Sequence, residues 1–206
     1  FVAVSGWFTK PVTSYVALLN RTGGTVWLDS FAASGGKSGY VRVDMPCDGK
    51  SVVAVNDDPS NTVGCELRHY NETGGLGPGW DSGDNIPDWI FDPALSPNDD
   101  FYSVAISGNG DVVATGPATS NRIYVITHGT VLDDGDDLLQ SVDLTFSGKY
   151  GAGGDNTGIL SFFSNYISWP LWTFVTGGCI HSVAISKIYP CMFPYPNHDI
   201  AVTSVV

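Results

Sequence analysis

Aromatic, acidic and amide side chains with the potential to bind a ligand gather in one glycine- and proline-rich stretch of the sequence. Its members are Trp80, Asp81, Asp84, Asn85 and Trp89. Flat aromatic faces beside carboxylates and amides are a common means of holding a sugar or anchoring an interface. We therefore predict that these five residues form the ligand-binding site. Other aromatic residues in or beside glycine- or proline-rich segments are Trp169, Trp172, Phe193 and Tyr195.

A second group with chemical potential is a short acidic run. Asp133, Asp134, Asp136 and Asp137 surround Gly135, which suits a sharp turn. Several carboxylates on one turn can offer the hard oxygen ligands that calcium prefers. The favoured interpretation is a solvated acidic turn that keeps a strand edge soluble. We predict no cofactor, with calcium at these four aspartates as the alternative.

Cysteines and glycosylation motifs leave the cellular compartment open. The cysteines are Cys47, Cys65, Cys179 and Cys191. They are compatible with two bridges, from Cys47 to Cys65 and from Cys179 to Cys191, or with free thiols. Acceptor motifs for N-glycosylation begin at Asn20 and Asn71, but triplets of this kind also occur by chance in a chain this rich in Asn, Ser and Thr.

The sequence carries no motif for catalysis. It lacks the Gly-x-Ser-x-Gly elbow of many serine hydrolases, and nothing pairs a histidine with a nucleophile and an acid. Asp81-Ser82-Gly83 is similar to the aspartic-protease triplet, but no apolar run places it at a strand end. A pair of aspartates at a distance suited to glycoside hydrolysis stays open. We predict that the protein is not an enzyme.

Charge and hydropathy narrow the classes of partner. The chain has 206 residues, with 21 acidic against 9 basic side chains and a formal charge of −12. Such a field repels nucleic acid, so we predict no nucleic-acid partner. No apolar run has the roughly 20 residues that span a bilayer, so we predict no membrane insertion. Since the chain begins at Phe1 without a signal segment, we expect a processed or excised piece.

These residues must be positioned by extended strands. Phe101 to Thr115 holds two β-rich runs around Asn109-Gly110, which predicts a hairpin. The pattern continues along the chain as about fourteen strand segments without a helix. Two segments read as loops instead, namely 71–100 and Lys149–Gly158. We predict an all-β fold: a single-domain antiparallel β-sandwich or barrel with long Gly/Pro-rich loops, covering residues 1–206.

The whole chain resembles a protruding spike domain from the capsid of a small non-enveloped RNA virus, similar in style to astrovirus spikes. The resemblance rests on low charge, Val/Ser/Thr/Gly-rich strands, large loops, a final strand over Ile200–Val206 and no catalytic motif. It implies attachment to a host receptor or glycan from the virion surface, usually as a homodimer. It also implies free cysteines, because the domain would form in a reducing compartment.

Two alternatives remain on the sequence alone. One is a secreted, lectin-like glycan-binding protein with bridged cysteines and bound calcium. The other is a secreted hydrolase whose carboxylates the sequence does not single out. For both the capsid spike and the lectin-like protein, the expected partner is a cell-surface receptor or carbohydrate.

Overall fold

The computed structural model describes most of the chain. The described part forms β-strands and contains no helix. The described residues are 1–9, 12–31, 41–56, 66–72, 86–91, 101–117, 123–127, 130–134, 139–167, 169–186 and 200–204. Within these ranges no helix is long and apolar enough to cross a membrane. The predicted all-β, antiparallel class is confirmed.

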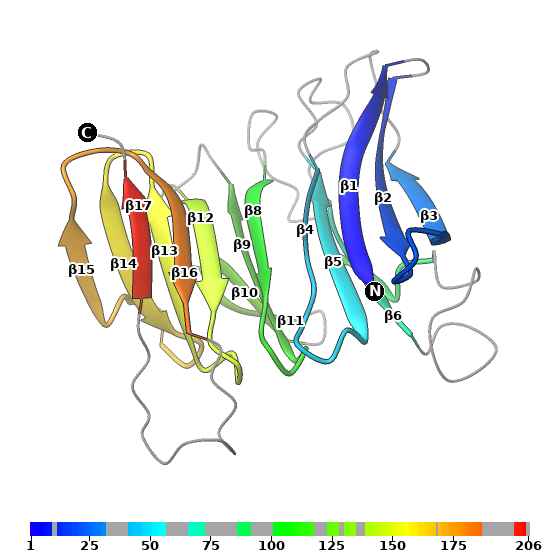
Figure 1. Cartoon of the computed structure of the whole chain (residues 1–206). Helices are drawn as coiled ribbons and strands as arrows, with labels where there is room; N and C mark the ends of the chain where they lie inside the picture. Colours follow the sequence, from blue (N-terminus) through cyan, green and yellow to red (C-terminus); the bar gives the residue numbers. More distant parts are fainter. Residues whose placement is uncertain are drawn as a thin grey trace. The chain divides into compact units, whose positions relative to one another are not determined.

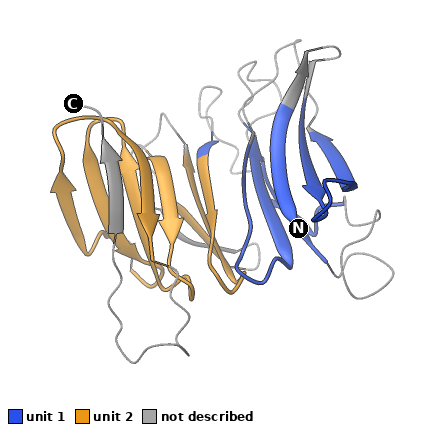
Figure 2. Ribbon diagram, in the orientation of Figure 1, with its two compact units in different colours: residues 1–102 blue, residues 103–206 orange. Residues whose placement is uncertain are grey.

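The chain divides into two compact units. Unit 1 comprises Phe1–Tyr102 and unit 2 comprises Ser103–Val206 (Figure 2). Both units consist of small antiparallel sheets in which each strand pairs with the next along the chain (Figure 1). The single domain expected from composition stays a prediction.

Unit 1 holds two sheets, ordered β1-β2-β3 and β4-β5-β6-β7. The turn between β2 and β3 is short and uses Gly23 at a φ of 82°, a conformation that suits glycine. The strands are β1 (Val2–Thr9), β2 (Val12–Leu19), β3 (Thr25–Phe31), β4 (Val41–Asp44), β5 (Ser51–Asn56), β6 (Leu67–Asn71) and β7 (Trp89–Phe91).

The core of unit 1 joins its two sheets. Val16 and Leu18 of β2 pack with Val52 of β5, and all three are fully buried. Trp27 of β3 stacks on Tyr70 of β6 with ring centroids 5.0 Å apart. Burial of large aromatic surface contributes strongly to stability, so this pair anchors one sheet to the other.

Unit 2 holds sheets ordered β8-β9-β10-β11, β12-β13-β14-β15 and β16-β17, and only the first two residues of β8 belong to unit 1. The first four strands are β8 (Phe101–Ile106), β9 (Val112–Pro117), β10 (Tyr124–Thr127) and β11 (Thr130–Asp134). The others are β12 (Leu139–Leu144), β13 (Tyr150–Asp155), β14 (Ile159–Ser164), β15 (Trp172–Val175), β16 (Ile180–Ile185) and β17 (Ile200–Ser204).

The predicted hairpin around Asn109-Gly110 is confirmed as β8 and β9. The N–H of Ser107 donates to the carbonyl of Val112 at 2.8 Å, which closes the connection. Gly110 has a φ of 80°. The short side chain of Asn109 also donates from Nδ2 to Asp111 at 2.7 Å. Local turn chemistry therefore determines this element, as the sequence indicates.

The segment predicted as a glycine-rich loop at Lys149–Gly158 is wrong, because most of it is the buried strand β13. Its glycines allow large side chains to approach from both faces. A Cβ on Gly151 would collide with the ring of Phe163, and a Cβ on Gly154 would collide with Ile180. Glycine in a strand interior often marks such a close approach.

The sheet β12–β15 packs on both of its faces. On one face Leu144 and Phe163 join the core that includes residues of β8, β9 and β10. On the other face Ala152 and Leu160 pack against β16. Two side chains of β12 secure this second contact: Ser141 Oγ accepts from Val183 N–H at 2.9 Å, and Asp143 Oδ2 accepts from Ile185 N–H at 3.0 Å.

Two further strands lie where the sequence predicted loops or turns. β7 lies within the stretch 71–100, which we expected to be irregular throughout. β11 contains Asp133 and Asp134, which we expected in a turn. β7 pairs with β6 and β11 pairs with β10, so pairing with a neighbouring strand decides their conformation.

Candidate interaction surface

The predicted ligand-binding cluster is described only at Trp89. Trp89 begins β7 and is partly buried, and its ring stacks on His69 with centroids 5.0 Å apart and planes 6° apart. One of its faces is therefore occupied by the imidazole. Trp80, Asp81, Asp84 and Asn85 lie outside the described residues, so their convergence with Trp89 stays a prediction.

Asp88 adds a carboxylate to this pair. Its Oδ2 lies 3.3 Å from Nδ1 of His69, and its N–H donates to the carbonyl of His69 at 2.8 Å. Partial burial raises the pKa of Asp88 above its usual value, although His69 acts in the opposite direction. His69 of β6 therefore contacts both Asp88 and Trp89, and these contacts link β6 to β7.

Two of the four predicted calcium ligands lie on β11, and the other two lie outside the described residues. Asp133 and Asp134 pair with Val125 and Tyr124 across the β10–β11 ladder. Asp136 and Asp137 lie outside the described residues. Among the side chains that the structure describes, no three of His, Cys, Asp and Glu gather as metal ligands. Calcium at this position stays a prediction.

The cysteines are described at two of their four positions. Cys47 is exposed and Cys179 is half-buried, and the two are not bridged to each other. Sγ of Cys179 lies 3.9 Å from Nδ1 of His181. The expected bridge partners Cys65 and Cys191 lie outside the described residues, so the pairing stays a prediction.

The two glycosylation motifs lie at strand ends. Asn20 follows β2, and its Oδ1 accepts hydrogen bonds from the N–H groups of Thr22 and Gly24, both at 2.9 Å. The amide of Asn20 thus shapes the β2–β3 turn. Asn71 is the last residue of β6, and Thr73 of its motif lies outside the described residues.

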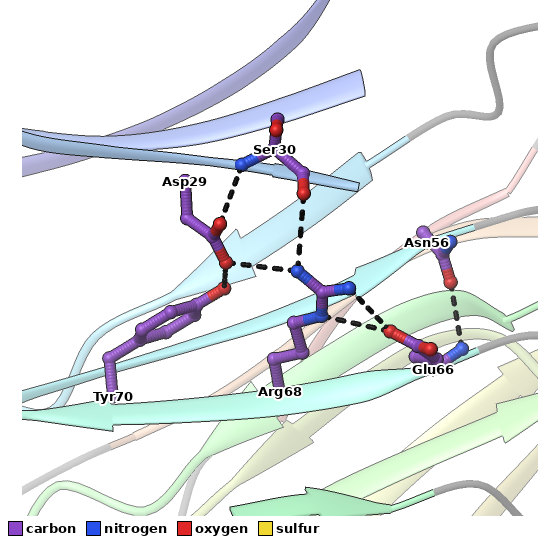
Figure 3. A network of polar contacts seen from close by, with 6 residues as sticks. All are labelled: Asp29, Ser30, Asn56, Glu66, Arg68 and Tyr70. Carbon is purple, nitrogen blue, oxygen red and sulfur yellow. Dashed lines mark hydrogen bonds and ion pairs between the residues drawn. The ribbon is translucent and has the colours of Figure 1, made fainter. Parts of the chain in front are cut away.

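A charged network that the sequence analysis did not identify links the two sheets of unit 1 (Figure 3). Arg68 of β6 donates from Nη1 to Asp29 of β3 at 2.9 Å. It also donates from Nη2 and Nε to Glu66, at 2.7 and 2.9 Å. Burial lowers the pKa of Arg68 and the hydrogen bond to Glu66 raises it, and the net shift is upward.

Tyr70 completes the network. Its hydroxyl donates to Oδ2 of Asp29 at 2.7 Å, the oxygen that Arg68 also contacts. Burial raises the pKa of Tyr70 strongly, and the negative charge of Asp29 raises it further. The charges of the network satisfy one another between two sheets, so the arrangement stabilises the fold.

The surface best suited to an outside molecule is the end of β14, the following connection and β15, which we name the β15 surface. Its exposed large apolar residues are Tyr166, Ile167, Trp169, Leu171, Trp172, Phe174 and Val175. Trp169 is 70 % exposed and Phe174 is 61 % exposed. These side chains lie in one short segment of the chain, and Trp172 and Phe174 share one face of β15. Several exposed apolar side chains close together commonly mark an interaction site, whereas single ones are ordinary.

Stacked rings lead from the sheet to this surface. Tyr150 of β13 stacks on Phe162 of β14 with centroids 5.5 Å apart, and Phe162 stacks on Trp172 of β15 at 5.3 Å. Nζ of Lys149 lies 5.1 Å from the centre of the Tyr150 ring. These contacts hold Trp172 in a fixed orientation although it is 44 % exposed. A rigid aromatic side chain loses little conformational entropy on binding.

The sequence signal for this surface is the lack of charge. No Asp, Glu, Lys or Arg occurs between Asp155 and Lys187, in a chain whose charged residues make up 15 per cent. Trp169 and Trp172 lie in or beside Gly- or Pro-rich segments, but the cluster around Trp80 combines aromatic with acidic and amide side chains, so the sequence favours that cluster. An uncharged aromatic strand is also the pattern of a buried strand, so the sequence does not reveal its exposure.

Comparisons with known proteins give a fold and no family. No protein-family model and no curated protein matches the chain. Three solved structures of Sqt1 from Chaetomium thermophilum share the fold over 92 % of this chain, with TM-scores of 0.63, 0.63 and 0.62 and identities of 17 %, 17 % and 16 %. One of them is bound to the N-terminus of the ribosomal protein L10. The chain spans about half of their length, between 47 % and 50 %.

This likeness corrects the functional interpretation made from the sequence. Attachment of a viral capsid projection to a host receptor or glycan is wrong, because the chain shares its fold with solved structures of Sqt1. The corresponding partners, a cell-surface receptor or carbohydrate, are wrong for the same reason, since the partner in one of these structures is a protein segment. The expected location, on a virion or alternatively outside the cell, is wrong on the same ground.

Proposed function

We propose that this chain is a non-catalytic protein-binding domain with β-propeller-like sheets, and that a protein segment binds at the β15 surface. The observation that carries the proposal is the exposure of Trp172, Phe174 and Val175 together on one strand. Tryptophan and other aromatic side chains are prominent among residues that dominate binding energy at protein interfaces. Antiparallel sheets that follow one another along the chain are also the units of β-propellers.

Two further observations support a protein partner. The Sqt1 structure bound to the N-terminus of L10 is an example of this fold holding a segment of another protein. The formal charge of −12 favours a segment with neutral or basic residues, because long-range attraction raises the rate of encounter. The lack of charge at the surface itself then favours apolar contact once the partner has arrived.

The test is selection from a phage-displayed library of random linear peptides on the folded chain. We expect the selected peptides to bind a variant with Trp172→Ala and Phe174→Ala at least about ten-fold more weakly, in line with the loss of two hot-spot side chains. Ile90→Ala is the matched control, because Ile90 is 53 % exposed on β7 in unit 1. Equal affinity of the selected peptides for wild type and the double variant would contradict the proposal.

A further inference from the structure

The backbone of β15 has a free edge in the part of the chain that the structure describes. β15 is the last strand of its sheet and pairs with β14 alone (Figure 1). Thr176 N–H donates to the Gly158 carbonyl at 2.8 Å. In an antiparallel ladder the bonded pairs alternate, so Phe174 and Trp172 face β14 with their backbone groups. The N–H and C=O groups of Thr173 and Val175 therefore face the free edge.

This edge lacks the devices that protect the corresponding strands of other sheets. β3 carries Asp29, and β7 has three residues and follows Asp88. β11 ends at Asp133-Asp134, and its register shifts opposite Val125 and Ile126. Charges, shortness and irregular register are the usual means of preventing a new strand from pairing. β15 has the sequence Trp-Thr-Phe-Val and a regular register, with no charge.

The side chains of β15 suit an added strand. Trp172 and Phe174 lie opposite Phe162 and Leu160 on one face, where the row of stacked rings ends. All four residues of β15 are exposed. Side chains at alternate positions of a neighbouring strand would lie beside Trp172 and Phe174, at the spacing of cross-strand pairs. The backbone would supply affinity and these contacts would supply selectivity.

We propose that a segment of a partner protein adds to β15 as a fifth strand, with apolar residues at alternate positions and a net positive charge. This inference rests on the proposed function and specifies its binding mode. A second copy of the chain is disfavoured as the occupant, because two molecules of formal charge −12 repel each other. A basic segment, in contrast, is attracted by this negative charge.

The experiment uses a labelled nine-residue peptide of alternating Lys and Val and measures fluorescence anisotropy. Its control has the same sequence with N-methyl groups on two consecutive central residues, which removes one donor from each edge of the peptide. We expect the plain peptide to bind at least about ten-fold more tightly than the methylated one. Equal affinity would overturn strand addition, because charge and side chains are the same in both. Failure of the plain peptide to bind would also overturn it.

Hydrogen exchange on the wild-type protein provides the second measurement, and it does not depend on the folding of a variant. We expect the amides of Thr173 and Val175 to exchange at least about ten-fold more slowly in the complex, with Trp172 and Phe174 unchanged. Thr173→Pro should abolish binding of the plain peptide, whereas Thr173→Ala keeps the N–H and should bind within about two-fold.

Other outcomes separate this inference from the proposed function. Library-selected peptides that depend on Trp172 and Phe174 but leave the amides of Thr173 and Val175 unprotected would leave the surface in place and overturn the strand. A dimer in light scattering, with the same two amides already protected in the free protein, would identify a second copy as the occupant and overturn the partner segment.

Discussion

Nη1 of Arg68 lies 2.9 Å from Oδ2 of Asp29, and this contact joins strands from the two sheets of unit 1. Both side chains are largely buried, at 14 % and 20 % exposure. Breaking a buried ion pair by removing one partner leaves the other charge poorly solvated, which is costly. The same guanidinium also holds Glu66, so Arg68 balances two carboxylates.

We therefore predict that Arg68→Met lowers the free energy of unfolding by about 3 kcal/mol. The measurement is urea-induced unfolding followed by tryptophan fluorescence. Lys50→Met is the control, because the Lys50–Glu72 pair is longer, at 3.7 Å, and Lys50 is 62 % exposed. That control should change stability by less than about 1 kcal/mol. Similar effects of the two substitutions would show that the network contributes little.

Tyr70 should make the fold sensitive to alkali. Its pKa in the folded protein is raised far above the ordinary value of 10.0. Above about pH 10 the unfolded chain therefore releases a proton that the folded chain retains, so stability falls as pH rises, by about 1.4 kcal/mol per pH unit. Below pH 10 the stability that depends on the protonated Tyr70 hydroxyl is fully present.

Tyr70→Phe tests this linkage. At pH 7 the variant should be less stable than wild type by about 1 kcal/mol, because the hydrogen bond to Asp29 is lost. The difference should shrink, and then reverse, as pH rises through 10 to 11, because phenylalanine does not titrate. Urea unfolding at each pH measures it. A difference that stays constant up to pH 11 would rule out the raised pKa of Tyr70.

The close packing around the glycines of β13 predicts the effect of a substitution there on stability. Gly151→Ala should lower the free energy of unfolding by about 1 to 3 kcal/mol, since its Cβ would collide with Phe163 and Leu144. Phe163→Leu in the same molecule should recover part of that loss, because the colliding atom is at the far end of the ring. Thermal and urea unfolding of the single and double variants measure the coupling.

Gly177→Ala is the matched control for that experiment. Gly177 has a φ of 86°, and a Cβ there would have no neighbour within 4 Å. Its cost of about 1 kcal/mol should come from backbone conformation alone. We expect it to add to the effect of Phe163→Leu without coupling. Coupling at Gly177 as large as at Gly151 would show that crowding is not the cause.

Local patterns in the sequence predict much of the fold. The sequences of β2 (Val12–Leu19) and β5 (Ser51–Asn56) are β-rich runs of the kind from which the sequence predicts strands. The β8–β9 hairpin follows from Asn109-Gly110, whose turn chemistry acts between neighbouring residues. Alternation and turn residues are local properties, so they are readable without the rest of the molecule.

The candidate site was less predictable. The sequence around Trp172 and Phe174 has the same apolar, β-rich pattern as the buried strand β5. Their exposure depends on the position of β15 at the end of its sheet, and sheet order involves partners distant in the sequence. Likewise, Arg68 and Asp29 are separated by two strands, and no local pattern indicates that they meet.

By itself the sequence determined that this chain forms antiparallel strands joined by glycine and asparagine turns, and that it carries a large negative charge. Only the tertiary structure decided that β13 is a buried strand and that β15 is an exposed edge. The physical reason is that conformation at a turn or along an alternating run is set by adjacent residues. Burial is set by which strand lies beside another, and that is a property of the assembled sheets.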